Sequence, residues 1–416
     1  MFKKFFEGFS KLNLIAGLQQ VFVMFGATVL VPLLTGLDVG VALIAAGVGT
    51  IIFHIVTGFG VPIFLGSSFA FIPPIIAISK MSGGSLPMAL GGVAVAGLMY
   101  IVVALIFTKV KPEKLWLVLP PTVTGSIIIL IGLLLAPVAI NNIGTGGIVW
   151  LTAFITFTTG VFVKVYIGNR NKFIGTLPII FSLAIGYIVA TLFGLVDFTY
   201  VKQASWIGIP KFSLPIFNWS AIAIAVPVAI VTIIEHFGDI VAVGGITGKD
   251  YIKNPGIHKT LIGDGIATSI SAMIGGPANT TYSENTGSLA LTGNHNPVIM
   301  RIAALFAILL GFVPKFTAII QSIPGPVIGG ISVLLFGMIA ATGIRTMVDN
   351  KVDLSLPNNL IVCSAILVIG LGVSILDIGG FKISGLGLAS IVGIILNFFL
   401  NKKSFGIKGK EYEIHY

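Results

Sequence analysis

The stretch GGPANTTYSENTGSLA, residues 275–290, interrupts a chain that is otherwise dominated by apolar residues. It is too short and too polar to cross a membrane as a helix, which needs about 20 mostly apolar residues. Its small and β-branched residues favour an extended strand, and Ser283 or Asn285 is suited to cap a following half-helix. Glu284 is its only charged residue. The stretch therefore predicts a broken element that carries an acid.

The composition around this stretch is that of a membrane protein. Of the 416 residues, 56% are hydrophobic and 9% are charged, whereas a soluble domain has about 25% charged residues. Long apolar runs recur along the whole chain and predict a polytopic, all-α fold. We expect 14 segments, near residues 13–35, 40–58, 66–79, 88–108, 118–137, 148–166, 173–194, 219–240, 258–274, 282–292, 297–313, 324–343, 356–376 and 384–400.

The basic residues predict the orientation of these segments. With 14 segments and both termini in the cytoplasm, 19 of the 24 Lys and Arg residues lie on the cytoplasmic side and 5 outside. Such asymmetry is typical of membrane topology. The charge of +10 therefore reflects orientation rather than nucleic-acid binding, and we expect a multi-pass protein of the cytoplasmic membrane. Cys363 is the only cysteine, which excludes an intrachain disulfide.

A second short segment lies at a matching place in the first half of the chain. Residues 61–75, VPIFLGSSFAFIPPI, contain an extended GSSFAF stretch, and Pro73 and Pro74 suit the first turn of a half-helix. The two short segments are third in each set of seven. Matching broken segments indicate an inverted-repeat transporter whose site lies where they meet. The alternative is that Gly and Pro merely kink two ordinary helices.

Two more acids fall within an apolar segment. Glu235 and Asp239 in VTIIEHFGDIVAV are four residues apart, so they share one face of a helix. An ionised side chain at the bilayer centre costs about 2.5–3.5 kcal/mol. Together with Glu284, these acids are expected to face a wet cavity or to hold protons, as proton coupling requires. The alternative is that Glu235 and Glu284 are static braces for backbone N–H groups.

The remaining ionisable residues are less informative. We expect Asp264 to lie at the cytoplasmic end of its segment, His54 to be a core histidine, and His236 to have a packing or gating role as readily as a ligand contact. No His, Cys, Asp or Glu cluster has metal-ligand spacing, and no nucleotide-binding or hydrolase motif occurs. The sequence predicts neither an enzyme, a cofactor nor an ATP-driven pump.

Several motifs in one order resemble the nucleobase:cation symporter family, closest to its uracil permeases. The resemblance covers nearly the whole chain. It rests on FVMFGATVLVPLLTG (22–36), LGSSFAFIPPI (65–75), EHFGD (235–239), PANTTYSENTG (277–287) and GGISVLLFGMIAATGIR (329–345).

The resemblance implies a fold of 14 segments in two inverted sevens, with strands in segments 3 and 10. A core domain comprises segments 1–4 and 8–11, and a gate domain comprises segments 5–7 and 12–14, with a homodimer formed through the gate. The corresponding ranges are 1–110 for the first part of the core, 111–212 for the first part of the gate, 213–320 for the second part of the core, and 321–416 for the second part of the gate with a cytoplasmic tail.

The resemblance also implies the roles of site residues. Glu235 and Glu284 would accept hydrogen bonds from the N–H edges of a pyrimidine, and the backbone N–H groups of Phe69 and Ser283 would meet its carbonyls. Phe69 and Tyr282 would line the pocket, and Ala27 would pack near the ring. Carboxylates accept and backbone N–H groups donate, so this arrangement suits the alternating edges of uracil.

The chain departs from the uracil permeases at three positions. Asp239 stands where they have a second histidine, Phe336 stands for the tyrosine that pairs with that histidine, and Gln20 completes Gln-Gln rather than Gln-His. Gly238-Asp239 is more like the xanthine-type members, while Glu284-Asn285 is more like the uracil type.

These observations predict a proton-coupled uracil importer in which Asp239 carries the coupled proton. Glu235 and Glu284, which bind substrate, also belong to the coupling group. One alternative is a purine base such as xanthine, with H⁺ or Na⁺ as the coupling ion. Another is an anion exchanger or channel of the same fold, although such a site would be expected to present cations or bare helix N-termini rather than acids.

Overall fold

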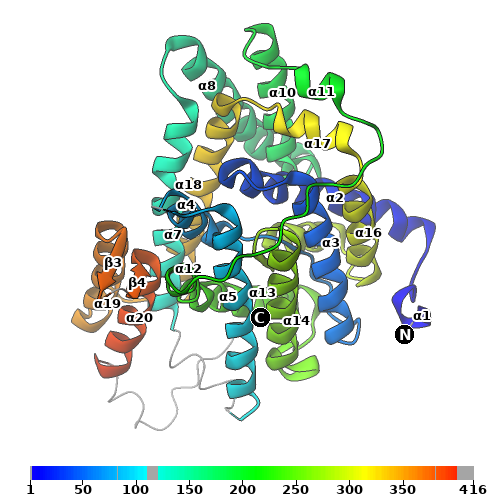
Figure 1. Cartoon of the computed structure of the whole chain (residues 1–416). Coiled ribbons are helices and arrows are strands. Elements are labelled where there is room, and N and C mark those ends of the chain that lie inside the picture. The colour runs from blue at the N-terminus through cyan, green and yellow to red at the C-terminus, as the bar shows by residue number, and fades with distance from the viewer. Residues whose placement is uncertain (1, 82, 110–119, 380, 401–416) are drawn as a thin grey trace.

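The computed structural model of the chain describes residues 2–81, 83–109, 120–379 and 381–400. Within these ranges the protein is mostly helical (Figure 1). The basic loop expected at residues 110–119 and the expected cytoplasmic tail at 401–416 lie outside the described residues.

The helices follow most of the expected apolar runs, because those runs are long and predominantly apolar. The α-helices are α1 (Phe2–Phe5), α2 (Lys11–Thr35), α3 (Val39–Val56), α4 (Ile72–Lys80), α5 (Leu86–Phe107), α7 (Pro121–Ile143), α8 (Gly147–Phe162), α9 (Gly168–Arg170), α10 (Pro178–Leu192), α11 (Thr199–Gln203), α12 (Trp219–Ala225), α13 (Val228–Thr247), α14 (Ile257–Ile274), α15 (Ser283–Thr292), α16 (Val298–Gly311), α17 (Pro314–Gln321), α18 (Gly325–Asp349), α19 (Pro357–Gly372) and α20 (Gly385–Leu400). Short 3₁₀ or π turns are η1 (Phe69–Phe71), η3 (Val163–Ile167), η4 (Ile174–Thr176) and η5 (Ile252–Gly256).

The helices have the length and composition of membrane spans. In the described part of the chain, 7 helices are long and apolar enough to cross a bilayer, or 8 if α16 and α17, bent by 84° at their junction, form one span. Several others are apolar but shorter. The polytopic, mostly helical fold is therefore confirmed. The arrangement of 14 segments in two inverted halves stays a prediction.

A small sheet forms where the two broken segments meet. Strands β1 (Leu65–Ser67) and β2 (Asn279–Thr281) pair antiparallel, with Leu65 opposite Thr281 and Ser67 opposite Asn279. After β1 the chain continues into η1 and α4, and after β2 it continues into α15. The expected pattern of strand followed by half-helix is thus confirmed in both segments. Antiparallel pairing also means that α4 and α15 leave opposite ends of the sheet.

Glycine permits the close approach of side chains at this sheet. An ideal Cβ built on Gly66 would lie 2.2 Å from Cζ of Tyr282. No larger residue fits there without moving the buried ring, because protein interiors are close-packed.

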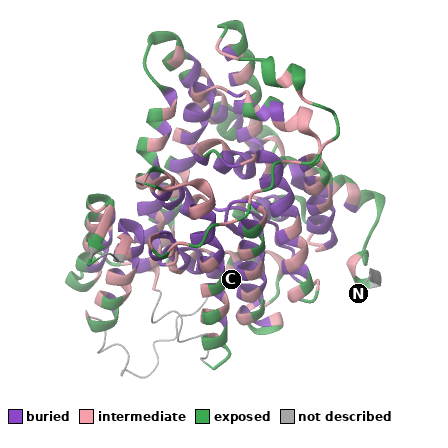
Figure 2. Ribbon diagram, in the orientation of Figure 1, coloured by how far each residue is buried: buried purple, intermediate pink, exposed green. Residues whose placement is uncertain are grey.

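Small residues also bring the long helices together. α7 packs along α18, α5 along α14, and α3 along α16. An ideal Cβ on Gly132 would lie 2.5 Å from the carbonyl of Phe336, so α7 and α18 touch backbone to backbone, as membrane helices commonly do. Buried residues fill the middle of the molecule, whereas exposed residues gather at its loops and outer helices (Figure 2).

A buried arginine ties the N-terminal residues to the body of the protein. Arg301 on α16 donates to the carbonyls of Phe5 (2.7 Å), Glu7 (3.2 Å) and Phe59 (3.3 Å). Its guanidinium also lies 5.4 Å from the centre of the Phe59 ring. The charge is therefore paired with three carbonyl dipoles and an aromatic face.

A β-hairpin near the C-terminus was not expected. Strands β3 (Ile375–Ile378) and β4 (Phe381–Ser384) pair antiparallel between α19 and α20, at one edge of the molecule (orange and red, Figure 1). The alternation ILDI-GG-FKIS is a hairpin signal. The hairpin was missed because its residues lie between two apolar runs that were expected to form the segments 356–376 and 384–400.

Candidate functional site

The predicted acids converge beside the small sheet. Glu235 and Asp239 lie on the unbroken helix α13, which contacts both β2 and α15. Glu235 lies close enough to Asp239 and Glu284 to interact with both electrostatically. Each of the three side chains is only partly exposed. Three carboxyl groups from two separate elements thus share one region at the centre of the chain's fold.

Asp239 is held by the end of a strand. The hydroxyl of Thr281, the last residue of β2, donates to Oδ2 of Asp239 at 2.5 Å. This bond joins α13 to the sheet. The carboxyl of Asp239 therefore has a defined position facing β2 rather than a free rotamer.

Glu284 lies in the first turn of α15. The residue at the N-cap is Tyr282, and its side chain makes no capping bond. The expectation that Ser283 or Asn285 caps this helix is therefore wrong, because Ser283 is already the first helical residue and Asn285 turns into the core. The N-cap side chain leaves the first turn uncapped, and the carboxyl of Glu284 accepts from its own backbone N–H. Helix N-termini attract electron-rich groups.

Tyr282 and Ala27 belong to the packed side of the sheet. Tyr282 is 3% exposed, and its hydroxyl donates to the carbonyl of Ser67 (3.1 Å) and accepts from Thr28 (3.4 Å). Ala27 on α2 is fully buried. Both residues are buried, and the hydrogen bonds of Tyr282 join it to β1 and α2.

Phe69 and Ser283 stand at the start of the two half-helices. Ser283 is exposed, and Phe69 is half-buried. The ring of Phe69 meets the ring of Phe336 on α18 edge to face, with centroids 6.1 Å apart. Phe336, which replaces the expected family tyrosine, is 1% exposed.

The position of Asp264 near one end of its segment did not predict its burial. It is fully buried, and its Oδ2 lies 2.8 Å from Nδ1 of the equally buried His236. This pair joins α13 to α14. Asp264 lies in the second turn of α14, and a sequence position near a helix end does not reveal burial. Its place on the cytoplasmic side stays a prediction. His54 is a core histidine as expected, with Nε2 3.0 Å from the carbonyl of Ile63.

A polar network that we did not foresee supports α15. The side chain of Asn285 donates to Oε1 of Gln20 (2.8 Å) and to its carbonyl (3.1 Å), and Gln20 donates to Ser288 (3.2 Å). Gln20 and Asn285 are fully or almost fully buried. Their separation of 265 residues left no sequence signal for the pairing beyond the polarity of the two side chains.

The acids border open space. Ideal Cβ atoms built on Gly238 of α13 and Gly287 of α15 would meet no atom within 4 Å. Within the described ranges, no three His, Cys, Asp or Glu side chains are placed to hold a metal ion. The site therefore offers hydrogen-bond acceptors and N–H groups on helix faces that no other residue covers at Gly238 and Gly287.

Comparison with solved structures identifies the fold. The fold matches the transmembrane domain of BicA, a cyanobacterial bicarbonate transporter, with a TM-score of 0.65 over 92% of this chain and 96% of that chain at 17% identity. This chain therefore shares the fold of that transmembrane domain.

Comparison with sequences defines the family. A model described as a permease family matches residues 12–379. The probable uracil permease of Haemophilus influenzae is 43% identical over 392 residues, covering 93% of this chain and 94% of that protein. The uracil permease of Bacillus caldolyticus is also 43% identical, over 92% of this chain and 90% of that protein. The chain belongs to this permease family and is a transporter rather than an enzyme.

Proposed function

We propose that this permease imports uracil by symport with protons. The observation that carries the proposal is the meeting of Glu235, Asp239 and Glu284 at the paired strands, beside an uncapped helix start. The two relatives named as uracil permeases support uracil as the substrate.

Recognition follows from the donors and acceptors of the base. Glu235 and Glu284 accept from its N–H groups, while the backbone N–H groups of Phe69 and Ser283 donate to its carbonyls. Phe69 lines the pocket with its ring. Tyr282 also lines the pocket and fixes the sheet through its hydrogen bond to Ser67, and Ala27 packs near the ring of the base.

Asp239 carries the coupled proton. Its carboxyl is bonded to Thr281 of β2, so a change in its protonation alters a contact between α13 and the sheet. Glu235 and Glu284 lie near it and belong to the same coupled group. At about 2.3 kcal/mol per charge per 100 mV, one proton per uracil drives useful accumulation.

The transport cycle requires two bodies that move relative to each other. We assign residues 1–110 and 213–320 to a core that carries the substrate, and residues 111–212 and 321–416 to a gate that also forms a homodimer. The 14 segments form two inverted halves, and both termini lie in the cytoplasm. Such halves rock around a site at their interface.

A purine base is the second candidate, because the pair Gly238-Asp239 resembles the xanthine-type members. The shared fold with the bicarbonate transporter BicA is not a reason to propose an anion as the substrate. The site of this chain presents three acids, which would repel an anion. Competition of labelled uracil uptake by unlabelled uracil and xanthine separates the two bases.

The decisive experiment is uptake of radiolabelled uracil into proteoliposomes with the inside pH above the outside pH. Wild type is expected to take up uracil only with the gradient, and Glu284→Gln to take up about 10- to 100-fold less at subsaturating uracil. Asp239→Asn is expected to lose the response to the gradient. If uptake by Asp239→Asn still follows the gradient, Asp239 does not carry the coupled proton. If folded wild type takes up no uracil, uracil is not the substrate.

A further inference from the structure

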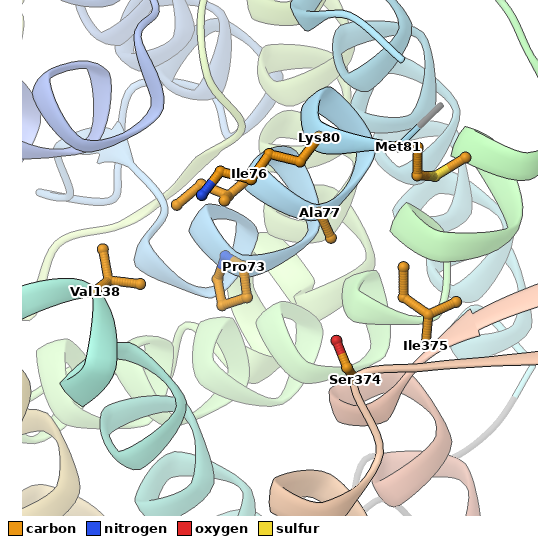
Figure 3. Close-up of a pocket in the computed structure, with 8 residues that line it drawn as sticks. All are labelled: Pro73, Ile76, Ala77, Lys80, Met81, Val138, Ser374 and Ile375. Atoms are coloured by element: carbon orange, nitrogen blue, oxygen red, sulfur yellow. The ribbon is translucent and has the colours of Figure 1, made fainter. Parts of the chain in front are cut away.

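A cavity lies beside α4, the half-helix that leaves the opposite end of the sheet from α15 and Glu284. It has a volume of about 460 Å³, within the usual range of small-molecule clefts. One wall is a single face of α4 and the other comes from α7 and the start of the hairpin (Figure 3). The lining residues are Pro73, Ile76, Ala77, Lys80, Met81, Val138, Ser374 and Ile375.

The α4 wall leads directly to Phe69. Pro73 is four residues after Phe69, about one helical turn, and η1 runs into α4 without a gap. The cavity therefore ends about one turn from the edge-to-face contact of Phe69 with Phe336.

The opposite wall leads to the same contact. The carbonyl of Phe336 faces Gly132 of α7, and Val138 of the cavity lies six residues farther along α7, about 9 Å at 1.5 Å per residue. On both walls the cavity thus lies beyond the Phe69–Phe336 pair.

The acids lie in the other direction. Leu65, the end of β1 farther from α4, pairs with Thr281, which binds Asp239. Glu284 follows on α15, which leaves that same end of the sheet. Along the path from β1 through η1 to α4, Phe69 and its contact with Phe336 therefore come after the end of the sheet beside the acids and before the cavity.

We propose that this cavity is the outer vestibule of the transport path, and that the Phe69–Phe336 contact is the barrier between it and the acids. The proposal rests on the proposed function, since it takes a small uncharged polar ring as the passing molecule. One aromatic contact is a weak seal that thermal motion can break. Lys80 at the rim is one of the few basic residues assigned to the outside.

Cysteine labelling tests the vestibule. Because Cys363 is the only cysteine, Cys363→Ser provides a cysteine-free background for Ala77→Cys in the cavity and Ser283→Cys beside the acids. A membrane-impermeant thiol reagent is added to the outside of intact cells on ice. Ala77→Cys is expected to react, and Ser283→Cys to resist.

Removing one ring tests the barrier. Adding Phe336→Ala is expected to raise the labelling rate of Ser283→Cys about 2- to 10-fold, the size of effect expected for one lost aromatic contact. The matched control is Ile344→Ala, which truncates an exposed side chain of the same helix and leaves the rate unchanged. All variants are first shown to elute as single monodisperse species.

Three results overturn the proposal. They are Ala77→Cys that reacts only from the cytoplasmic side or only after denaturation, Ser283→Cys that reacts as fast as Ala77→Cys with Phe336 intact, and a Phe336→Ala rate equal to that of the control. Labelling requires no transported substrate. The labelling result can therefore be read even if the protein does not take up uracil, so failure of this proposal and failure of the proposed function are distinguishable.

Discussion

The two broken segments share a backbone plan and differ in chemistry. The β1–α4 segment contributes apolar and aromatic groups, including Phe69, and one wall of the cavity. The β2–α15 segment contributes Asn279, Thr281 and Glu284. Asn279 is fully buried and donates to the carbonyl of Ala45 at 3.2 Å. The two segments thus have the same backbone geometry and different roles. One segment shapes the proposed transport path, and the other holds the polar groups.

The largest effect is expected from Gly66→Ala, which disturbs the sheet that both segments share. The new Cβ would meet the Tyr282 ring at 2.2 Å, and overpacking of this kind costs about 1–3 kcal/mol or more. We expect uptake to be lost and the melting temperature in detergent to fall.

The control for this change is Gly60→Ala, whose Cβ would meet no atom within 4 Å. Equal melting temperatures for the two variants would show that the close Gly66–Tyr282 contact does not determine the stability of the sheet.

The next largest effect is expected from Glu284→Gln, which removes charge from the polar segment alone. Hydrogen bonds to charged groups contribute about 1.5–3 kcal/mol, so uptake at subsaturating uracil should fall about 10- to 100-fold with little change in melting temperature. Asp349→Asn, an exposed acid on α18, should leave uptake unchanged. Comparable uptake by the two variants would remove Glu284 from the site.

A smaller effect is expected from Thr281→Val, which removes the bond to Asp239. Loss of one hydrogen bond costs about 1 kcal/mol, so we expect uptake to fall about fivefold. Thr280→Val is a closely matched control, because the buried Thr280 hydroxyl has no hydrogen-bond partner among the described residues. If both valines reduced uptake equally, the effect would come from strand packing rather than from Asp239.

The smallest effect is expected from Gly287→Ala in the polar half-helix. Its Cβ would point into open space, and Ala favours a helix over Gly by about 1 kcal/mol. Uptake should therefore stay near the wild-type rate while thermal stability rises slightly. A severe loss of uptake would place the passing substrate against this face of α15.

Sequence reasoning was strongest where local patterns determine structure. The strands and half-helices followed from short polar stretches rich in Gly, Pro and β-branched residues, and the shared face of Glu235 and Asp239 followed from helical spacing. Such features depend on neighbours within a few residues, so a single chain reveals them.

It was weakest where distant residues meet. The pairing of Gln20 with Asn285, the burial of Asp264 against His236, and the contact of Arg301 with the N-terminal carbonyls all depend on tertiary packing. No local pattern encodes these partners. The acids were recognised as unusual because a charge in an apolar run is costly, but the groups that hold them emerged only from the structure.

The strand pair also has a consequence for how the protein is made. About 200 residues separate β1 from β2, and ribosomes add about 5–20 residues per second. The early strand must therefore wait roughly 10–40 s for its partner, with backbone groups that a bilayer cannot satisfy. During translation, water, the insertion machinery or a chaperone must therefore satisfy the unpaired backbone groups of β1. This need ends when β2 pairs with β1.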